Sequence, residues 1–238
     1  MKYNVAVFAY DFCHQKTYDL LVGLQLFGIK KVIVIAAPKV KLNNQIEKKI
    51  YQSRDQENVI HPRDICRKLH YDYHVCPHDN IIEIQSYTLK SESNIAIISG
   101  ARIIKKNIID LFHYGVINYH PGSLPETSGL DSIYWMIEKN VRPLASAHFI
   151  DSKVDAGELI DESSISVNLG DTLEIIKKNL YLAQLKLHNK VCNKIANNEV
   201  FETQTIVRPF KNSSMTKEQK ELSLKKFIDW KKYYSKIN

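Results

Sequence analysis

Val32-Ile33-Val34-Ile35-Ala36-Ala37 is an unbroken apolar run whose first four residues are β-branched. β-branched residues favour strands, and a strand that is apolar at every position is covered on both of its faces. The segment Ile95-Ala96-Ile97-Ile98 repeats this pattern. Buried strands of this kind are typical of the centre of a parallel sheet. The two runs therefore predict an α/β fold.

Short apolar runs alternate with helical patterns along the first 120 residues, as expected for strands connected by helices. We predict an open, Rossmann-like, mostly parallel sheet flanked by helices. The predicted strands are 4–9, 31–36, 73–75, 94–99, 116–118, 144–150 and 158–167, and the predicted helices are 17–27, 62–70, 105–112, 132–139 and 171–196. Asp171, with Glu174 three residues later, resembles a cap for the last of these helices.

Residues 201–238 have a different character, with a short β-prone segment at 202–207 and a lysine-rich helix predicted at 217–234. We divide the chain into a main domain, residues 1–200, and a C-terminal extension, residues 201–238. Three roles remain open for this extension: it packs back on the domain, closes over a substrate, or meets another subunit. Its aromatic residues offer surface for burial, and we expect a homodimer; they are Phe227, Trp230, Tyr233 and Tyr234.

The composition is that of an ordinary globular protein, with 44% hydrophobic and 25% charged residues among 238. No run approaches the ~18 apolar residues of a membrane span. The first residues read as a strand rather than as a signal peptide, so we expect a cytoplasmic protein with no membrane partner. The four cysteines form no disulfide framework, and we expect them to be reduced, small buried residues.

The net charge of +7 is diffuse, apart from several lysine-rich stretches. It permits an anionic partner, but no basic motif interleaved with aromatic residues accompanies it. A basic, non-enzymatic protein that binds nucleic acid is therefore the alternative from another functional class. Our expectation is that nucleic acid is not a partner.

Asn118-Tyr119-His120-Pro121-Gly122-Ser123-Leu124-Pro125 follows the apolar strand segment Val116-Ile117. Side chains alternate along a strand, so Asn118 and His120 point to the same side. The carboxyl ends of parallel strands are where α/β proteins bind ligands. An amide that donates hydrogen bonds and an imidazole that exchanges protons near neutral pH are thus expected at a site of chemistry.

Three features together resemble the formyltransferases that use a formylated tetrahydrofolate: the Asn-x-His-Pro-Gly-x-Leu-Pro motif, Gly129 with Trp135, and His148-x-x-Asp-x-x-x-Asp155-x-Gly. The resemblance implies that Asn118, His120 and Asp155 are the catalytic residues. An amine attacks the formyl carbon, and an amide and an imidazolium stabilise the oxyanion that develops. Asp155 would orient His120, favour its protonated form and help to accept the proton of the amine.

The resemblance also implies N10-formyltetrahydrofolate as co-substrate and no metal. The segment after the strand at 94–99 resembles the loop of this family that contacts the folate, and the segment at 151–155 resembles the loop that closes its other side. The expected folate contacts are Arg102, Ile103, Ile104, Asp151 and Lys153. Ile104 could instead simply pack at the start of a helix.

The segment after the first predicted strand, residues 10–17, lacks a glycine-rich phosphate cradle. It still offers an aromatic ring and a cation near a helix start, where anions are favoured. We expect it to bind the substrate, with a nucleotide base on the ring and a pyrophosphate near the lysine. The expected substrate contacts are Asp11, Phe12, His14 and Lys16.

Three acceptors compete within this family: a nucleotide-linked amino sugar, methionyl-tRNA and glycinamide ribonucleotide. The tRNA enzymes usually have an Arg before the glycine, where this chain has Ser128 before Gly129, and they add a β-barrel for which residues 201–238 are too few. The purine enzymes have a glycine-rich phosphate loop after the first strand. Gly129-Leu130-Asp131 and Trp135 are more similar to the sugar enzymes. We expect dTDP-4-amino-4,6-dideoxyglucose as acceptor, for O-antigen synthesis.

A group of histidines and cysteines between residues 66 and 78 offers side chains of the types that bind zinc. It contains no Cys-x-x-Cys pair, and its members alternate between a predicted helix and an extended segment. Packing is the preferred interpretation. The group comprises Cys66, His70, His74, Cys76 and His78.

Overall fold

The structure, a computed structural model, describes residues 2–39, 60–151, 157–207 and 212–236. The chain divides into two compact units. Unit 1 comprises Met1–Ile117 and Cys192–Glu199, and unit 2 comprises Asn118–Val191 and Val200–Asn238. The chain passes between the units within the strand β5, Val116–His120. A domain boundary at residue 200 stays a prediction, although the chain also changes unit at that position.

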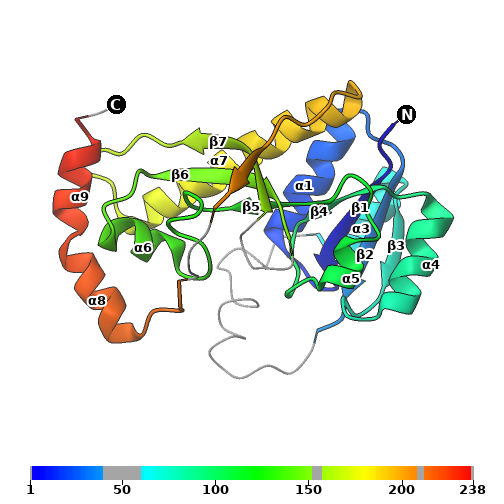
Figure 1. Cartoon of the computed structure of the whole chain (residues 1–238), viewed down its shortest axis with the longest axis horizontal. Helices are drawn as coiled ribbons and strands as arrows, with labels where there is room; N and C mark the ends of the chain where they lie inside the picture. Colours follow the sequence, from blue (N-terminus) through cyan, green and yellow to red (C-terminus); the bar gives the residue numbers. More distant parts are fainter. Residues whose placement is uncertain (1, 40–59, 152–156, 208–211, 237–238) are drawn as a thin grey trace. The chain divides into compact units, whose positions relative to one another are not determined.

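Unit 1 is built on parallel strands in the order β3-β2-β1-β4-β5. Helices connect these strands; α1 contacts α3, and α4 contacts α5. Figure 1 shows α1 and α4 on opposite sides of the strands. The elements are β1 (Val5–Tyr10), α1 (Gln15–Leu26), β2 (Val32–Ala37), α3 (Pro62–Leu69), β3 (Asp72–Val75), α4 (Ile81–Ser91), β4 (Ile95–Ile98), α5 (Lys106–Ile109) and the start of β5.

The core of unit 1 lies in β1 and β2, in which every residue is buried. Val5 pairs with Val32 and Tyr10 with Ala37, so the two apolar strands match along their whole length. Each fully buried Val or Ile side chain contributes about 1.5–3 kcal/mol to folding. The two-faced burial predicted for the run at residues 32–37 is confirmed, because helices cover both of its faces.

Unit 2 contains antiparallel strands in the order β6-β7-β8. The pairing of β6 with β7 shifts register between Ala147 and His148, which leaves Ile160 of β7 as an extra residue. Together the units have the mixed α/β fold that the sequence predicts. The elements of unit 2 are α6 (Ser132–Glu138), β6 (Leu144–Phe149), β7 (Gly157–Ser164), α7 (Leu173–Ala196), β8 (Gln204–Ile206), α8 (Lys217–Lys225) and α9 (Phe227–Tyr234). The helix α7 belongs to unit 2 up to Val191, and its remaining residues belong to unit 1.

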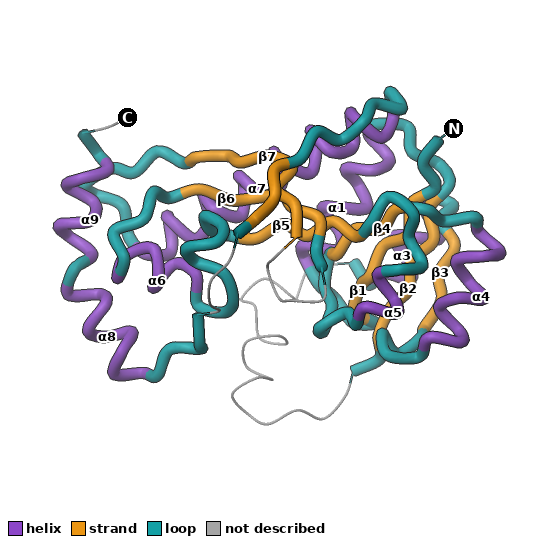
Figure 2. Tube along the Cα trace, in the orientation of Figure 1, coloured by secondary structure: helices purple, strands orange, loops and turns teal. Residues whose placement is uncertain are grey.

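The C-terminal segment packs back on unit 2, which is one of the three roles considered for it. Figure 2 shows α8 and α9 following each other beside α6, and α6 contacts α8. The Trp230 indole donates to Val141 O at 3.0 Å, and the Tyr234 hydroxyl donates to Asn140 O at 2.7 Å. These two aromatic residues are thus buried within their own chain. The Tyr233 side chain remains 53% exposed.

Three local predictions differ from the structure. The helix α4 was not predicted, because Ile82 and Leu89 are exposed and its apolar residues therefore do not mark one face. The helix predicted at 217–234 is two helices that meet at Lys226. The cap of α7 is Thr172 rather than Asp171: the Thr172 hydroxyl accepts from Ile175 N–H at 3.3 Å.

Three of the four cysteines are buried, as expected, and Cys13 is half-buried; all four are free thiols. Within the described ranges, no helix has both the length and the apolar character needed to cross a membrane.

Candidate functional site

His120 lies at the carboxyl end of β5 and is 4% exposed. Its Nε2 is 2.9 Å from the carbonyl oxygen of Thr127. A carbonyl oxygen only accepts hydrogen bonds, so Nε2 carries a hydrogen in both the neutral and the charged imidazole. Nδ1 is therefore the ring nitrogen at which the neutral and the charged imidazole differ.

Thr127 holds the loop against His120 through its side chain as well. Its hydroxyl donates to Ser123 O at 2.7 Å, and its oxygen lies 3.5 Å from His120 Nε2. Both Thr127 and Ser128 are completely buried. The loop that accepts the imidazole hydrogen is therefore a packed part of unit 2, which fixes the orientation of the ring.

Asn118, two residues before His120, is held by a second histidine. Its amide Nδ2 is 3.2 Å from Nε2 of His148, which is fully buried on β6. Because the amide nitrogen only donates, His148 Nε2 is the acceptor and the ring is neutral, with its hydrogen on Nδ1. The second N–H of the amide remains a donor for a ligand. The pairing fixes how Asn118 presents its donor.

His148 received no role from sequence reasoning, although it opens the His-x-x-Asp-x-x-x-Asp-x-Gly motif. The signal that could have identified it is its position near the end of β6, the strand that follows β5. Its place beside the register shift of β6 and β7 agrees with the use of bulges to aim side chains at sites.

The segment after β1 brings several groups of unit 1 together around Asp11. The Tyr73 hydroxyl donates to Asp11 Oδ1 at 2.6 Å, and this oxygen is 3.5 Å from the Arg63 guanidinium and 3.8 Å from His61 Nε2. Asp11 is therefore already engaged by a tyrosine hydroxyl and a guanidinium, with the His61 ring nearby. Burial, followed by the hydrogen bond to Asp11, raises the pKa of Tyr73.

The other three expected substrate contacts lie in the same segment. The Phe12 ring stacks on Tyr10, with 4.9 Å between centroids and 14° between planes. His14 Nδ1 is 2.9 Å from the Thr17 hydroxyl, and burial, followed by the charge of Lys16, lowers the pKa of His14 to about 4. His14 is thus neutral at pH 7. In this segment Lys16 carries the positive charge.

Packing accounts for four of the five histidines and cysteines between residues 66 and 78, whereas His70 is exposed. Burial raises the pKa of the Cys66 thiol to about 12. His78 is buried, with Nε2 3.0 Å from Ile35 O, and the His74 ring stacks on Tyr87 at 4.2 Å between centroids. Among the described residues, no group of three or more potential ligands is placed to hold a metal ion.

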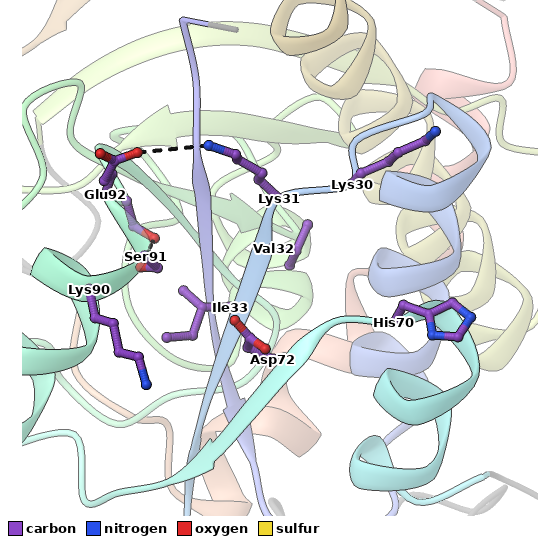
Figure 3. Close-up of a pocket in the computed structure, with 10 residues that line it drawn as sticks. Lys30, Lys31, Val32, Ile33, His70, Asp72, Lys90, Ser91 and Glu92 are labelled. Carbon is purple, nitrogen blue, oxygen red and sulfur yellow. Dashed lines mark hydrogen bonds and ion pairs between the residues drawn. The ribbon is translucent and has the colours of Figure 1, made fainter.

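A cavity of about 280 Å³ in unit 1 lies at the amino ends of β2 and β3 (Figure 3). Both basic and acidic residues line it, and Lys31 forms an ion pair with Glu92 at 3.7 Å. The residues that line it include Lys30, Lys31, His70, Asp72, Lys90 and Glu92. It contains none of the predicted site residues, which follow the carboxyl ends of strands.

Comparison with known proteins identifies the chain. A model of the formyl transferase family matches residues 32–191. The chain belongs to the formyl transferase family. It is 25% identical over 113 residues to phosphoribosylglycinamide formyltransferase from Bacillus subtilis, a match that covers 47% of this chain and 58% of that relative.

Solved structures share the fold of this formyl transferase family member. The N-formyltransferase from Helicobacter canadensis, solved with folinic acid and dTDP-3-aminofucose, superposes with a TM-score of 0.63 at 18% identity, covering 91% of this chain and 72% of that one. Phosphoribosylglycinamide formyltransferase from Anaplasma phagocytophilum superposes with a TM-score of 0.62 at 17% identity, covering 88% and 94%. At these identities the likeness establishes the fold alone.

The predicted folate contacts of this formyl transferase family member fall on two segments. In unit 1, Arg102, Ile103 and Ile104 follow β4; the Ile103 side chain is 70% exposed, whereas Ile104 is 4% exposed. In unit 2, Asp151 follows β6 and is exposed. Ile104 is thus buried near the start of α5, whereas Arg102, Ile103 and Asp151 are exposed. The roles of all four residues in folate binding stay predictions.

Lys153 and Asp155, the remaining predicted site residues, lie outside the residues that the structure describes. Their roles in folate binding and in proton transfer stay predictions. The described part of the candidate site is therefore the end of β5 with its two supporting groups, His148 and the carbonyl of Thr127.

Gly122 permits the close approach of the Thr127 loop to His120. A Cβ atom at Gly122 would lie 2.1 Å from Thr127 Oγ1 and 3.1 Å from His120 Nε2. The Thr127 hydroxyl cannot rotate away without losing its hydrogen bond to Ser123 O. Only glycine therefore fits at this position without displacing the loop.

Replacing Gly122 by alanine is expected to lower kcat for formyl transfer about 10- to 100-fold, because the displaced loop misplaces His120. The free energy of unfolding should fall by about 1–3 kcal/mol from overpacking. Denaturant titration and steady-state kinetics measure the two effects. Gly170→Ala is the matched control, since nothing lies within 4 Å of a Cβ atom there. Wild-type kcat in Gly122→Ala would contradict this account of the loop.

Proposed function

We propose that this protein transfers the formyl group of N10-formyltetrahydrofolate to the amino group of a nucleotide-linked amino sugar. The observation that carries the proposal is the end of β5, where Asn118 and His120 are each held by a hydrogen bond that defines which atoms they offer. In a member of the formyl transferase family, an oriented amide donor and an oriented imidazole are the groups that acyl transfer to an amine requires.

In the reaction, the nitrogen of the amine forms a bond to the formyl carbon, and the carbonyl oxygen becomes an oxyanion. Asn118 donates to this oxyanion through its second N–H. The charged form of His120 donates through Nδ1, because its Nε2 hydrogen is bound by Thr127 O. These donors are fixed before the reaction, so little reorganisation opposes the step.

Proton transfer completes the formyl transfer. The nitrogen becomes positively charged when it bonds to the formyl carbon, and it then loses a proton to a group or water positioned by His120 and Asp155. Collapse of the tetrahedral intermediate breaks the bond between the formyl carbon and N10 of the folate, and N10 takes up a proton. The products are tetrahydrofolate and the formamide of the sugar.

The choice of an amino sugar rests on the sequence around the site. Gly129-Leu130-Asp131 and Trp135 are more similar to sugar enzymes, and residues 10–17 contain no glycine-rich phosphate cradle. One structural relative is described in complex with dTDP-3-aminofucose. We assign dTDP-4-amino-4,6-dideoxyglucose as acceptor, in O-antigen synthesis in the cytoplasm. Asp11, Phe12, His14 and Lys16 are the proposed substrate contacts.

Glycinamide ribonucleotide is the second candidate acceptor, because the relative from Bacillus subtilis is named phosphoribosylglycinamide formyltransferase. An incubation with N10-formyltetrahydrofolate and separate acceptors distinguishes the candidates. The panel comprises dTDP-, UDP- and GDP-linked amino sugars, glycinamide ribonucleotide and methionyl-tRNA. We expect a mass gain of one formyl group on a dTDP-linked sugar; formylation of only glycinamide ribonucleotide or tRNA would overturn the assignment.

A homodimer also belongs to the proposal. Trp230 and Tyr234 are already buried within the chain, so the exposed apolar residues of α8 and α9 are the surface that remains for a second copy. These residues are Leu222, Ile228 and Tyr233.

A further inference from the structure

Asn212, in the C-terminal segment, contacts the loop that holds His120. Its amide Nδ2 donates to Glu126 O at 2.8 Å and to Ser128 O at 3.0 Å, and the residue is 5% exposed. These two carbonyl groups flank that of Thr127, which accepts the hydrogen of His120 Nε2. The carbonyl used by the imidazole therefore lies between two that Asn212 fixes.

Lys139, at the end of α6, determines which way the Asn212 amide points. The lysine Nζ donates to Asn212 Oδ1 at 2.6 Å and to Glu126 O at 2.9 Å. The amide oxygen must therefore face the ammonium group, and the NH₂ group must face the two carbonyls. A backbone bridge between Gly129 and Asn212 holds the two segments side by side.

The side chains of the loop itself supply few hydrogen bonds on its Ser128 side. The Ser128 hydroxyl is buried and has no hydrogen-bond partner in the described part of the chain. The Thr127 hydroxyl donates back toward Ser123. Buried carbonyl groups need donors, and a lost donor costs about 1–3 kcal/mol. Asn212 thus donates to the carbonyl groups on both sides of Thr127, and Lys139 is a second donor to that of Glu126.

Further contacts dock the C-terminal segment on the same region without touching these carbonyls. The Trp135 indole donates to Ser213 O at 3.1 Å, and the Ser214 hydroxyl donates to Asp131 Oδ2 at 2.9 Å. Lys220 forms an ion pair with Asp131 at 2.8 Å. Docking of the segment and control of the loop are therefore separable by mutation.

We infer that Asn212 is a positioning residue for His120: the C-terminal segment completes the catalytic site by fixing the Thr127 carbonyl that holds the imidazole. The inference extends beyond the proposed function in giving the segment a role in the site, and its catalytic part rests on that function. A chain in which the segment is docked but Asn212 cannot donate should fold and yet leave His120 loosely held.

The test replaces Asn212 by aspartate, which has nearly the same shape, still accepts from Lys139 and cannot donate to Glu126 O or Ser128 O. Asn212→Ala repeats the loss without a new charge. Ser214→Ala is the control, because it removes a docking bond of the same segment and leaves the loop carbonyls untouched. Circular dichroism confirms that each variant is folded.

The first readout is hydrogen exchange of the His120 Nε2–H, followed by NMR in the full chain. Exchange should become at least about tenfold faster in both Asn212 variants and stay within about twofold of wild type in Ser214→Ala. The second readout is formyl transfer, with kcat of the Asn212 variants lowered about 10- to 100-fold and KM changed by less than about threefold.

Unchanged exchange in Asn212→Asp would overturn the inference, and so would an equal increase in Ser214→Ala, which would reduce Asn212 to one docking contact among several. Faster exchange with wild-type kcat would remove the catalytic part of the inference. Faster exchange in a protein that formylates none of the acceptors would sustain the link from Asn212 to His120 and refute the proposed function instead.

Discussion

Replacing His120 by alanine is expected to lower kcat for formyl transfer by about 10²–10⁴-fold, while the chain still folds. The substitution removes the imidazole whose Nδ1 hydrogen we assign to stabilisation of the oxyanion. Asp155→Ala is expected to lose a similar factor, because the carboxylate is assigned to support the charged imidazole and the transfer of the proton. Steady-state kinetics with the acceptor identified in the panel measure both losses.

His120→Gln separates chemistry from packing. The glutamine Nε2 can still donate to Thr127 O, but its amide does not exchange protons near neutral pH. The His120→Gln variant should therefore unfold close to the wild-type temperature and yet lose activity to nearly the same extent as His120→Ala. His113→Ala, at an exposed histidine outside the site, should be as active as wild type. If His120→Gln and His120→Ala both kept wild-type kcat, His120 would be a packing residue and the assigned chemistry would be wrong.

Replacing Asn118 by alanine is expected to lower kcat by about 10²–10³-fold, the loss typical for one oxyanion donor. The donor is needed mainly in the transition state, so KM should change little. The substitution also removes the amide that donates to Nε2 of the fully buried His148. The free energy of unfolding should therefore fall by about 1–3 kcal/mol. Kinetics and denaturant titration of the same preparation report the two effects separately.

Asn118→Asp makes the prediction sharper, since a carboxylate matches the shape of the amide but has no N–H to offer the oxyanion. It should lose at least as much kcat as alanine. Asn107→Ala, at an exposed asparagine on α5, is the matched control. An Asn118→Asp variant that works at the wild-type rate would show that no donor is required at this position.

Elements with a clear hydrophobic pattern were predictable, and those without one were not. The strands β1 and β2 are apolar at every position, and burial on both faces leaves no other arrangement for such runs. The helix α4 has Ile82 and Leu89 on its exposed side, so its sequence does not show the period of a half-buried helix. The cap of α7 shifted by one residue because Asp171 and Thr172 are both able to cap, and only the backbone geometry chooses between them.

The residues of the candidate site likewise divide into those that the sequence predicts and those that it does not. The motif at residues 118–125 and the period of β5 place Asn118 and His120 on one side of a strand end. His148 and Asn212 were not predicted as supports for them. His148 is 30 residues from Asn118, and Asn212 is 84 residues from Ser128. Such pairs depend on how strands and helices pack, which local patterns do not encode.

By itself, the sequence determined the α/β class, the resemblance to formyltransferases and the identity of the residues at the end of β5, because periodicity and side-chain chemistry are local properties. Only the tertiary structure decided which nitrogen of His120 is bound, which histidine orients Asn118, and that the C-terminal segment packs back to hold the Thr127 loop. These features arise from hydrogen bonds between distant segments, and their partners are selected only when the buried donors and acceptors of unit 2 come together.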